Sequence, residues 1–65
     1  METKTDIVVE LIGADGNIFA LMGRVRNALR RGGRSDLVEE FTKAVTNSKS
    51  YDEALAVIMD YVIVE

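Results

Sequence analysis

The chain has 65 residues, with 8 lysines and arginines against 11 aspartates and glutamates, so its formal net charge at pH 7 is −3. That length allows a single domain, residues 1–65, with a thin hydrophobic core. Cysteine and histidine are absent, which excludes disulfides and removes the side chains that zinc and the usual nucleophile–base pairs require. We therefore expect no metal, no cofactor and no enzymatic activity.

The apolar content of 48% is that of a globular domain and argues against disorder. No unbroken apolar run, including 7–9 and 61–64, approaches the roughly 20 residues that span a bilayer. Residues 1–6 lack the basic and apolar regions of a signal peptide. We expect a protein of the bacterial cytoplasm with no membrane contact.

The first predicted element is a strand over Asp6–Ile12, which is rich in β-branched residues. Alternation places Ile7, Val9 and Leu11 on one face, and Val8, Glu10 and Ile12 on the other. The segment Gly13–Asn17 breaks the strand, and we expect either Asp15 or Asn17 to cap the helix that follows.

A helical period begins at Ile18 and ends at Gly32 and Gly33, since glycine readily takes the left-handed conformation that terminates helices. The apolar stripe of this helix consists of Ile18, Leu21, Met22, Val25, Ala28 and Leu29.

Ser35 or Asp36 is expected to open a second helix, and Asp36 with Glu39 has the spacing of a capping box. The helix should stop near Asn47. Its predicted apolar face consists of Leu37, Phe41, Ala44 and Val45.

Ser50 is expected to open a third helix, with Glu53 at the capping-box position. The predicted buried side of this helix consists of Tyr51, Ala54, Leu55, Ile58 and Met59. Residues 61–64 are β-branched and aromatic, which indicates a second strand.

This order predicts an α+β domain of the β-α-α-α-β type, with two short strands and three helices packed on one face. Two strands are marginally stable alone and leave exposed edges. We therefore expect a homodimer, in which two copies share a four-stranded sheet across a two-fold axis.

The charge is polarised along the chain. Residues 50–65 contain acids and no base, whereas residues 16–35 contain no acid and five arginines: Arg24, Arg26, Arg30, Arg31 and Arg34. Three interpretations stay open: a solvated helix face, a phosphate-binding ridge for nucleic acid or a nucleotide, or pairing with an acidic surface of a second copy or a partner. The acidic net charge and the lack of interleaved aromatic residues weigh against nucleic acid.

Phe19 lies off the apolar stripe, one turn before Gly23 and in line with Arg26 and Arg30. Either it packs at the edge of the stripe, or it is an exposed aromatic anchor beside a glycine that lets another backbone approach. Aromatic and arginine side chains are the usual hot spots of interfaces. The candidate partner or self-interface therefore consists of Phe19, Gly23, Arg26 and Arg30.

Two further motifs favour structure over chemistry. Gly13–Asn17 lies where phosphate loops occur, but it lacks their Gly-Lys-Ser/Thr ending and the remaining ligands of a calcium loop. Glu39 and Glu40 are adjacent and so face different directions on a helix, which argues against a catalytic pair.

The run Leu11–Phe19, continued by 23–25 and 28–30, resembles small proteins of unknown function encoded by bacteriophages, prophages and mobile elements. Their shared feature is the Gly-x-Asp-Gly-Asn-x-Phe stretch at a strand-to-helix junction. The later residues that fit the pattern are Phe41, Ala44, 50–52, Met59, 61–62 and 64–65. The resemblance covers nearly the whole chain and implies an accessory role in a bacterial host, without a specific activity.

We therefore expect a non-enzymatic interaction module that binds, and inhibits or modulates, a protein partner. The alternative is a nucleic-acid or nucleotide binder that uses the arginine-rich first helix. Anisotropy measurements with generic DNA and RNA would separate the two, because phosphate binding falls steeply with salt.

Overall fold

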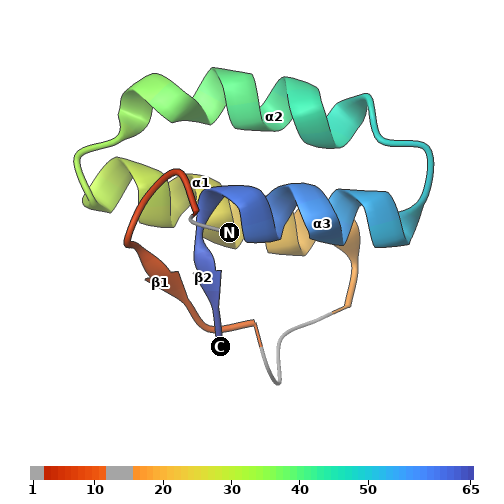
Figure 1. Ribbon diagram of the computed structural model, residues 1–65, viewed down its shortest axis with the longest axis horizontal. Helices are drawn as coiled ribbons and strands as arrows, with labels where there is room; N and C mark the ends of the chain where they lie inside the picture. The colour runs from red at the N-terminus through yellow and green to blue at the C-terminus, as the bar shows by residue number, and fades with distance from the viewer. Residues whose placement is uncertain (1–2, 12–15) are drawn as a thin grey trace.

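The computed structural model describes residues 3–11 and 16–65. Its elements are β1 (Val8–Val9), α1 (Ile18–Arg31), the short 3-10 helix η1 (Ser35–Leu37), α2 (Val38–Thr46), α3 (Tyr51–Tyr61) and β2 (Ile63–Val64) (Figure 1). This order confirms the predicted α+β class and the β-α-α-α-β arrangement.

The elements form three layers (Figure 1). Helix α2 packs across α1 and α3, which form the middle layer, and these two contact β1 and β2 respectively. All three helices therefore lie on one side of the strand pair, as predicted, although only α1 and α3 touch it. The buried core consists of Val9, Leu21, Met22, Val25, Leu29, Leu37, Phe41, Val45, Ala54, Ile58, Tyr61 and Val62.

The two strands are parallel neighbours, with Val8 opposite Ile63 and Val9 opposite Val64. Both are shorter than predicted. The strand expected over 6–12 is confined to Val8–Val9, and Ile12 lies outside the described residues. The strand expected from Tyr61 begins only at Ile63, because helical hydrogen bonding continues as far as the Val62 amide, which donates to the Ile58 carbonyl at 3.1 Å.

The two faces of β1 differ as the alternation predicts. Val9 is buried against the helices, whereas Val8 is half exposed on the outer face. Ile7, on the inner face, lies so close to Gly32 that a Cβ atom built there would be 2.5 Å from the Ile7 Cδ1 atom. Glycine at this position therefore allows the end of α1 to meet the strand.

Two helix caps form as predicted. The Asn17 side chain accepts a hydrogen bond from the Phe19 amide, and the Ser50 side chain accepts one from the Glu53 amide. The left-handed residue after α1 is Gly33, with φ of 77°.

The capping box predicted for the second helix is wrong. Residues 35–37 form η1, whose first turn has no side-chain cap, and α2 begins only at Val38. The Asp36 carboxylate instead accepts two hydrogen bonds from the Arg34 guanidinium, each at 3.2 Å. A nearby cation thus competes successfully with the helix amides for this carboxylate.

The predicted buried side of α3 is partly wrong. Ala54 and Ile58 are buried, but Tyr51 and Met59 are 46% and 55% exposed. Positions 51, 55 and 59 form an i, i+4 stripe that is rotated away from the core stripe of 54, 58 and 61. The apolar surface of α3 is therefore wider than the face of this helix that the other helices cover.

The segment before β1 is fastened to the end of α3. The buried Thr5 hydroxyl donates to the Tyr61 carbonyl at 2.6 Å and accepts from the Ile7 amide at 3.2 Å. The Lys4 amide donates to the Asp60 carbonyl at 2.8 Å. These bonds extend the contact between the two ends of the chain beyond the short strand pair.

Candidate interaction surface

The arginines of α1 occupy two separate flanks of the helix. Arg24 and Arg31 are two turns apart and line a groove beside β1. Arg26 and Arg30 lie about 100–160° around the helix from that pair, on the flank that also carries Phe19. The arginines expected to form one ridge are therefore divided into two pairs.

The fifth arginine is engaged within its own loop. The hydrogen bonds from Arg34 lower the pKa of the Asp36 carboxyl, and the same contact raises the pKa of the Arg34 guanidinium. Both side chains are largely exposed. Arg34 thus has a carboxylate partner and is separated from the other candidate phosphate ligands.

The four arginines on α1 have no carboxylate within 4 Å among the described residues. Arg30 makes a long 3.4 Å hydrogen bond to the Asn27 side chain, and Arg24 makes one of the same length to the Glu10 carbonyl. The Arg26 Nε atom is buried and has no hydrogen-bond partner in the described part of the chain. The positive charge of α1 is therefore not neutralised locally.

Phe19 is 77% exposed, the largest exposure of any big apolar side chain among the described residues. It borders a groove of about 370 Å³ between the start of α1 and the α2–α3 connection. The other residues lining this groove are Ile18, Met22, Val45, Thr46, Ser48, Lys49, Ser50, Tyr51 and Ala54. This exposure argues against packing of Phe19 at the edge of the stripe, and its role as an interface anchor stays a prediction.

Gly23 and Arg30 extend the surface around Phe19 along α1. A Cβ atom built on Gly23 would have no neighbour within 4 Å, so the space above this residue is open. Arg30 is exposed and Arg26 is half buried. The predicted set of Phe19, Gly23, Arg26 and Arg30 therefore lies on one flank of one helix.

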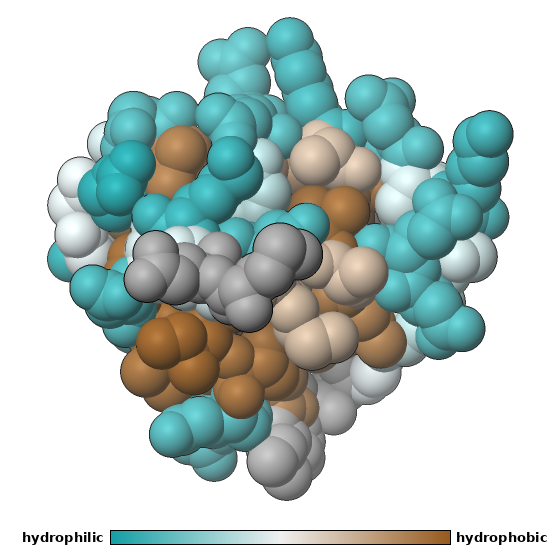
Figure 2. Space-filling model, in the orientation of Figure 1, coloured by the Kyte–Doolittle hydropathy of each residue, from teal (hydrophilic) through white to brown (hydrophobic). Residues whose placement is uncertain are grey.

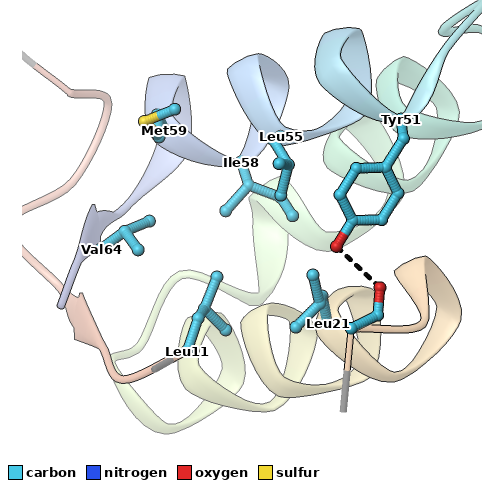
Figure 3. A pocket seen from close by; sticks show the side chains of 8 residues that line it. Leu11, Leu21, Tyr51, Leu55, Ile58, Met59 and Val64 are labelled. Carbon is cyan, nitrogen blue, oxygen red and sulfur yellow. Dashed lines mark hydrogen bonds between the residues drawn. The ribbon is translucent and has the colours of Figure 1, made fainter. Parts of the chain in front are cut away.

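A second apolar groove, of about 290 Å³, opens between α3, α1 and the strands. Figure 3 shows side chains from these elements pointing toward a common space, and the Tyr51 hydroxyl donating to the Gly16 carbonyl at 2.7 Å. The lining residues are Leu11, Gly16, Leu21, Tyr51, Leu55, Ile58, Met59 and Val64. Its volume lies at the lower limit of about 300 Å³ for small-molecule sites, and none of its described lining residues carries a carboxylate or an amine. Tyr51 borders both grooves.

The one tyrosine with a strongly shifted pKa lies away from both grooves. Burial, together with a hydrogen bond of 2.6 Å to the Glu40 carboxylate, raises the pKa of Tyr61 to about 12. Lys4 lies 3.7 Å from the same carboxylate. A phenol with a raised pKa is a poorer proton donor at neutral pH, so this cluster fastens α2, α3 and the N-terminal segment together.

The adjacent acids Glu39 and Glu40 point in different directions, as predicted from their spacing, and contact different residues. Glu39 lies 3.8 Å from Lys43, whereas Glu40 accepts from Tyr61. Within residues 3–11 and 16–65, no group of three or more acidic side chains is placed so that it could hold a metal ion. The predicted turn and cap at 13–15, including Asp15, lie outside the described residues.

Sequence reasoning missed the Tyr51–Gly16 hydrogen bond and the groove between β1 and α1. The tyrosine was assigned to the core because it continues the apolar periodicity of α3. The groove between β1 and α1 depends on the distance between these two elements, and no local sequence pattern specifies that distance.

None of the helices in the described ranges has the length and apolar character needed to cross a membrane. Comparison of the chain with protein-family models, with curated proteins and with solved structures gave no match.

Proposed function

We propose that this chain is a non-enzymatic interaction module that binds a protein partner through the surface around Phe19. The observation that carries the proposal is the exposure of this phenylalanine beside an apolar groove. An exposed aromatic side chain next to a groove is the arrangement from which interface hot spots are built. The lack of converging reactive groups among the described residues is compatible with a binding role.

The charges around this surface specify the chemistry of the partner. Arg26 and Arg30 lie on the same flank of α1 as Phe19, and Lys49 lines the groove itself. A complementary partner therefore presents apolar side chains among acidic ones. We propose an amphipathic, acidic segment of another protein as the occupant.

A second copy of the chain is also a candidate occupant of this surface, which would give a homodimer other than the shared four-stranded sheet predicted from the sequence. Helix α3 of a second copy carries Asp52, Glu53 and Asp60 and no base, together with the exposed apolar side chains Tyr51 and Met59. It therefore has the chemistry that the Phe19 surface selects. Light scattering at increasing protein concentration distinguishes a second copy from a foreign partner.

The cellular setting rests on the sequence resemblance alone. The chain resembles small proteins of bacteriophages and mobile elements, which are expected to act inside a bacterial host. If the chain acts in the same setting, its partner is a protein of the bacterial cytoplasm. Binding would then inhibit or modulate a host machine during infection or maintenance of the element.

Replacing Phe19 with alanine is expected to weaken partner retention about tenfold, because truncating a hot-spot aromatic removes about 1–2 kcal/mol of binding free energy. The melting temperature should hardly change, since substitutions of exposed side chains usually alter stability by less than about 0.5 kcal/mol. The measurement is quantitative pull-down from bacterial lysate with wild-type and variant bait, beside thermal unfolding.

The matched control is Met59→Ala, which truncates an exposed apolar side chain outside the groove beside Phe19. It should retain the same foreign proteins as the wild type, since Met59 enters the proposal only on the α3 face of a second copy. Equal retention by the Phe19→Ala bait, accompanied by a lower melting temperature, would assign Phe19 to the core and contradict the proposal.

The alternative function, binding of nucleic acid or a nucleotide, is favoured by one observation. Arg24, Arg26, Arg30 and Arg31 have no carboxylate partner in the described structure, so they are available to phosphates. Their division between two flanks limits the number of phosphates that one ligand can contact. Anisotropy with generic DNA and RNA at low salt should show binding that falls steeply with salt if this alternative holds, and no binding otherwise.

A further inference from the structure

The outer edge of β1 has no neighbouring strand among the described residues. The amides of Ile63 and Glu65 donate to the carbonyls of Ile7 and Val9, and the Leu11 amide donates to the Glu65 carbonyl. Main-chain groups alternate in direction along a strand, so those of Val8 and Glu10 point away from β2. These groups have no main-chain partner among the described residues and form an edge to which a strand can add, although the Glu10 carbonyl accepts a long hydrogen bond from Arg24.

The exposed face of the strand pair is incompletely covered. Val8 and Ile63 are directly opposite each other, and they are 50% and 41% exposed. Figure 2 shows the resulting hydrophobic patch over the two strands, with hydrophilic residues beside it. Parallel strands occur almost only where both faces are covered, so this patch favours a further element that docks here.

A groove of about 240 Å³ runs between this edge and α1. Its floor is apolar at Val9 and Ala28, and Arg24, Asn27 and Arg31 form its helical wall. Arg24 already reaches the strand, because its guanidinium makes the 3.4 Å bond to the Glu10 carbonyl. The two guanidinium groups therefore lie along the path that an added strand would follow.

We propose that the β1 edge and the arginine wall of α1 bind an extended acidic segment of a partner protein by strand addition. Backbone pairing with Val8 and Glu10 supplies affinity, and alternate side chains supply specificity. Side chains turned toward α1 are acidic and meet Arg24 and Arg31. The intervening side chains turn outward and are apolar, since they extend the patch of Val8 and Ile63.

The spacing of the two arginines agrees with this occupant. They are seven residues apart, which is about 10 Å along a helix axis at 1.5 Å per residue. Alternate residues of a strand are about 6.7 Å apart, and flexible arginine side chains can span the difference. The partner segment therefore carries carboxylates at every second position.

A second copy of β1 fits this edge poorly. An antiparallel pair centred on Val8 would place Asp6 of one copy opposite Glu10 of the other, and like charges directly opposite are destabilising. It would also bring Arg24 and Arg31 of both copies to the same side of the shared sheet. The four-stranded dimer expected from the sequence is therefore disfavoured at β1, and the site differs from the surface around Phe19.

The test uses the full chain and a short labelled peptide in which glutamate alternates with valine. Fluorescence anisotropy should show saturable binding of this peptide and none of a peptide with lysine in place of glutamate. Arg31→Glu should weaken binding at least about tenfold. Lys43→Glu makes a similar charge change at an exposed position of α2 that lines neither this groove nor the groove beside Phe19, and should alter the dissociation constant less than about twofold.

Amide hydrogen exchange distinguishes strand addition from attraction between charges. The amides of Val8 and Glu10 should exchange more slowly when the peptide is bound. Unchanged exchange at these amides, equal weakening by the Arg31→Glu and Lys43→Glu substitutions, or no binding of the glutamate peptide would each overturn the proposal. Protection of the Val8 amide by self-association without peptide would also overturn it, by making a second copy the occupant. Binding to the Phe19 surface is tested separately, because Phe19→Ala should leave peptide binding unchanged.

Discussion

Replacing Phe41 with alanine is expected to lower the free energy of unfolding by about 3–5 kcal/mol. Phe41 is fully buried where α2 meets α1 and α3, and its ring packs edge-on against the Tyr61 ring, with centroids 5.3 Å apart. Phenylalanine-to-alanine changes in cores destabilise by about 3–5 kcal/mol. A domain of this length has a total stability of only about 3–10 kcal/mol, so the substitution removes much or all of it.

Urea unfolding followed by circular dichroism measures this effect, and Phe19→Ala provides a matched control. Both variants lose the same side chain, but Phe19 is exposed. The control should unfold within about 0.5 kcal/mol of the wild type. Similar losses at the two positions would mean that the core does not lie where the structure places it.

The second large effect is a loss of stability at alkaline pH that depends on Tyr61. Burial and the contact with Glu40 raise the pKa of this phenol to about 12 in the folded chain, from an ordinary value of about 10. Between these values the unfolded chain releases the phenolic proton while the folded chain keeps it. The stabilisation is therefore complete below pH 10 and is lost as the pH rises through 12, by up to about 2–3 kcal/mol.

The free energy of unfolding from urea titrations at pH 8 to 12 tests this prediction. Tyr61→Phe removes the titrating group, so its stability should decline less over this range than that of the wild type. Tyr51→Phe also removes one tyrosine but leaves Tyr61 in place, and should retain the wild-type decline. A Tyr61→Phe variant whose stability falls as steeply as the wild type would show that another group causes the alkaline loss.

Local patterns predicted the helices well because each helix has an apolar stripe of its own, and α1 and α3 also have side-chain caps. Asn17 and Ser50 cap α1 and α3 as their side-chain chemistry dictates. The prediction failed at Asp36, where the spacing of a capping box was present but Arg34 captured the carboxylate. Which of two partners binds the Asp36 carboxylate depends on the geometry of the loop. The sequence spacing of a capping box does not specify that geometry.

The strands and the surfaces were predicted less well, because they depend on contacts between distant parts of the chain. β-branched composition located both strands, but it could not show that helical bonding would reach Val62 before β2 begins. The stripe of Tyr51 and Met59 is apolar and periodic, like a core face, yet no other described element covers it fully. Phe19 was recognisable because it departs from the stripe of its helix.

The most direct test of the proposed binding surface is a map of amide chemical shifts of the labelled chain with and without the captured partner. The account predicts that the largest changes in chemical shift fall at the amides of Phe19, Met22 and Ala54, around the groove beside Phe19. Changes confined to the opposite flank of α1 or to α2, with those three amides unaffected, would contradict it.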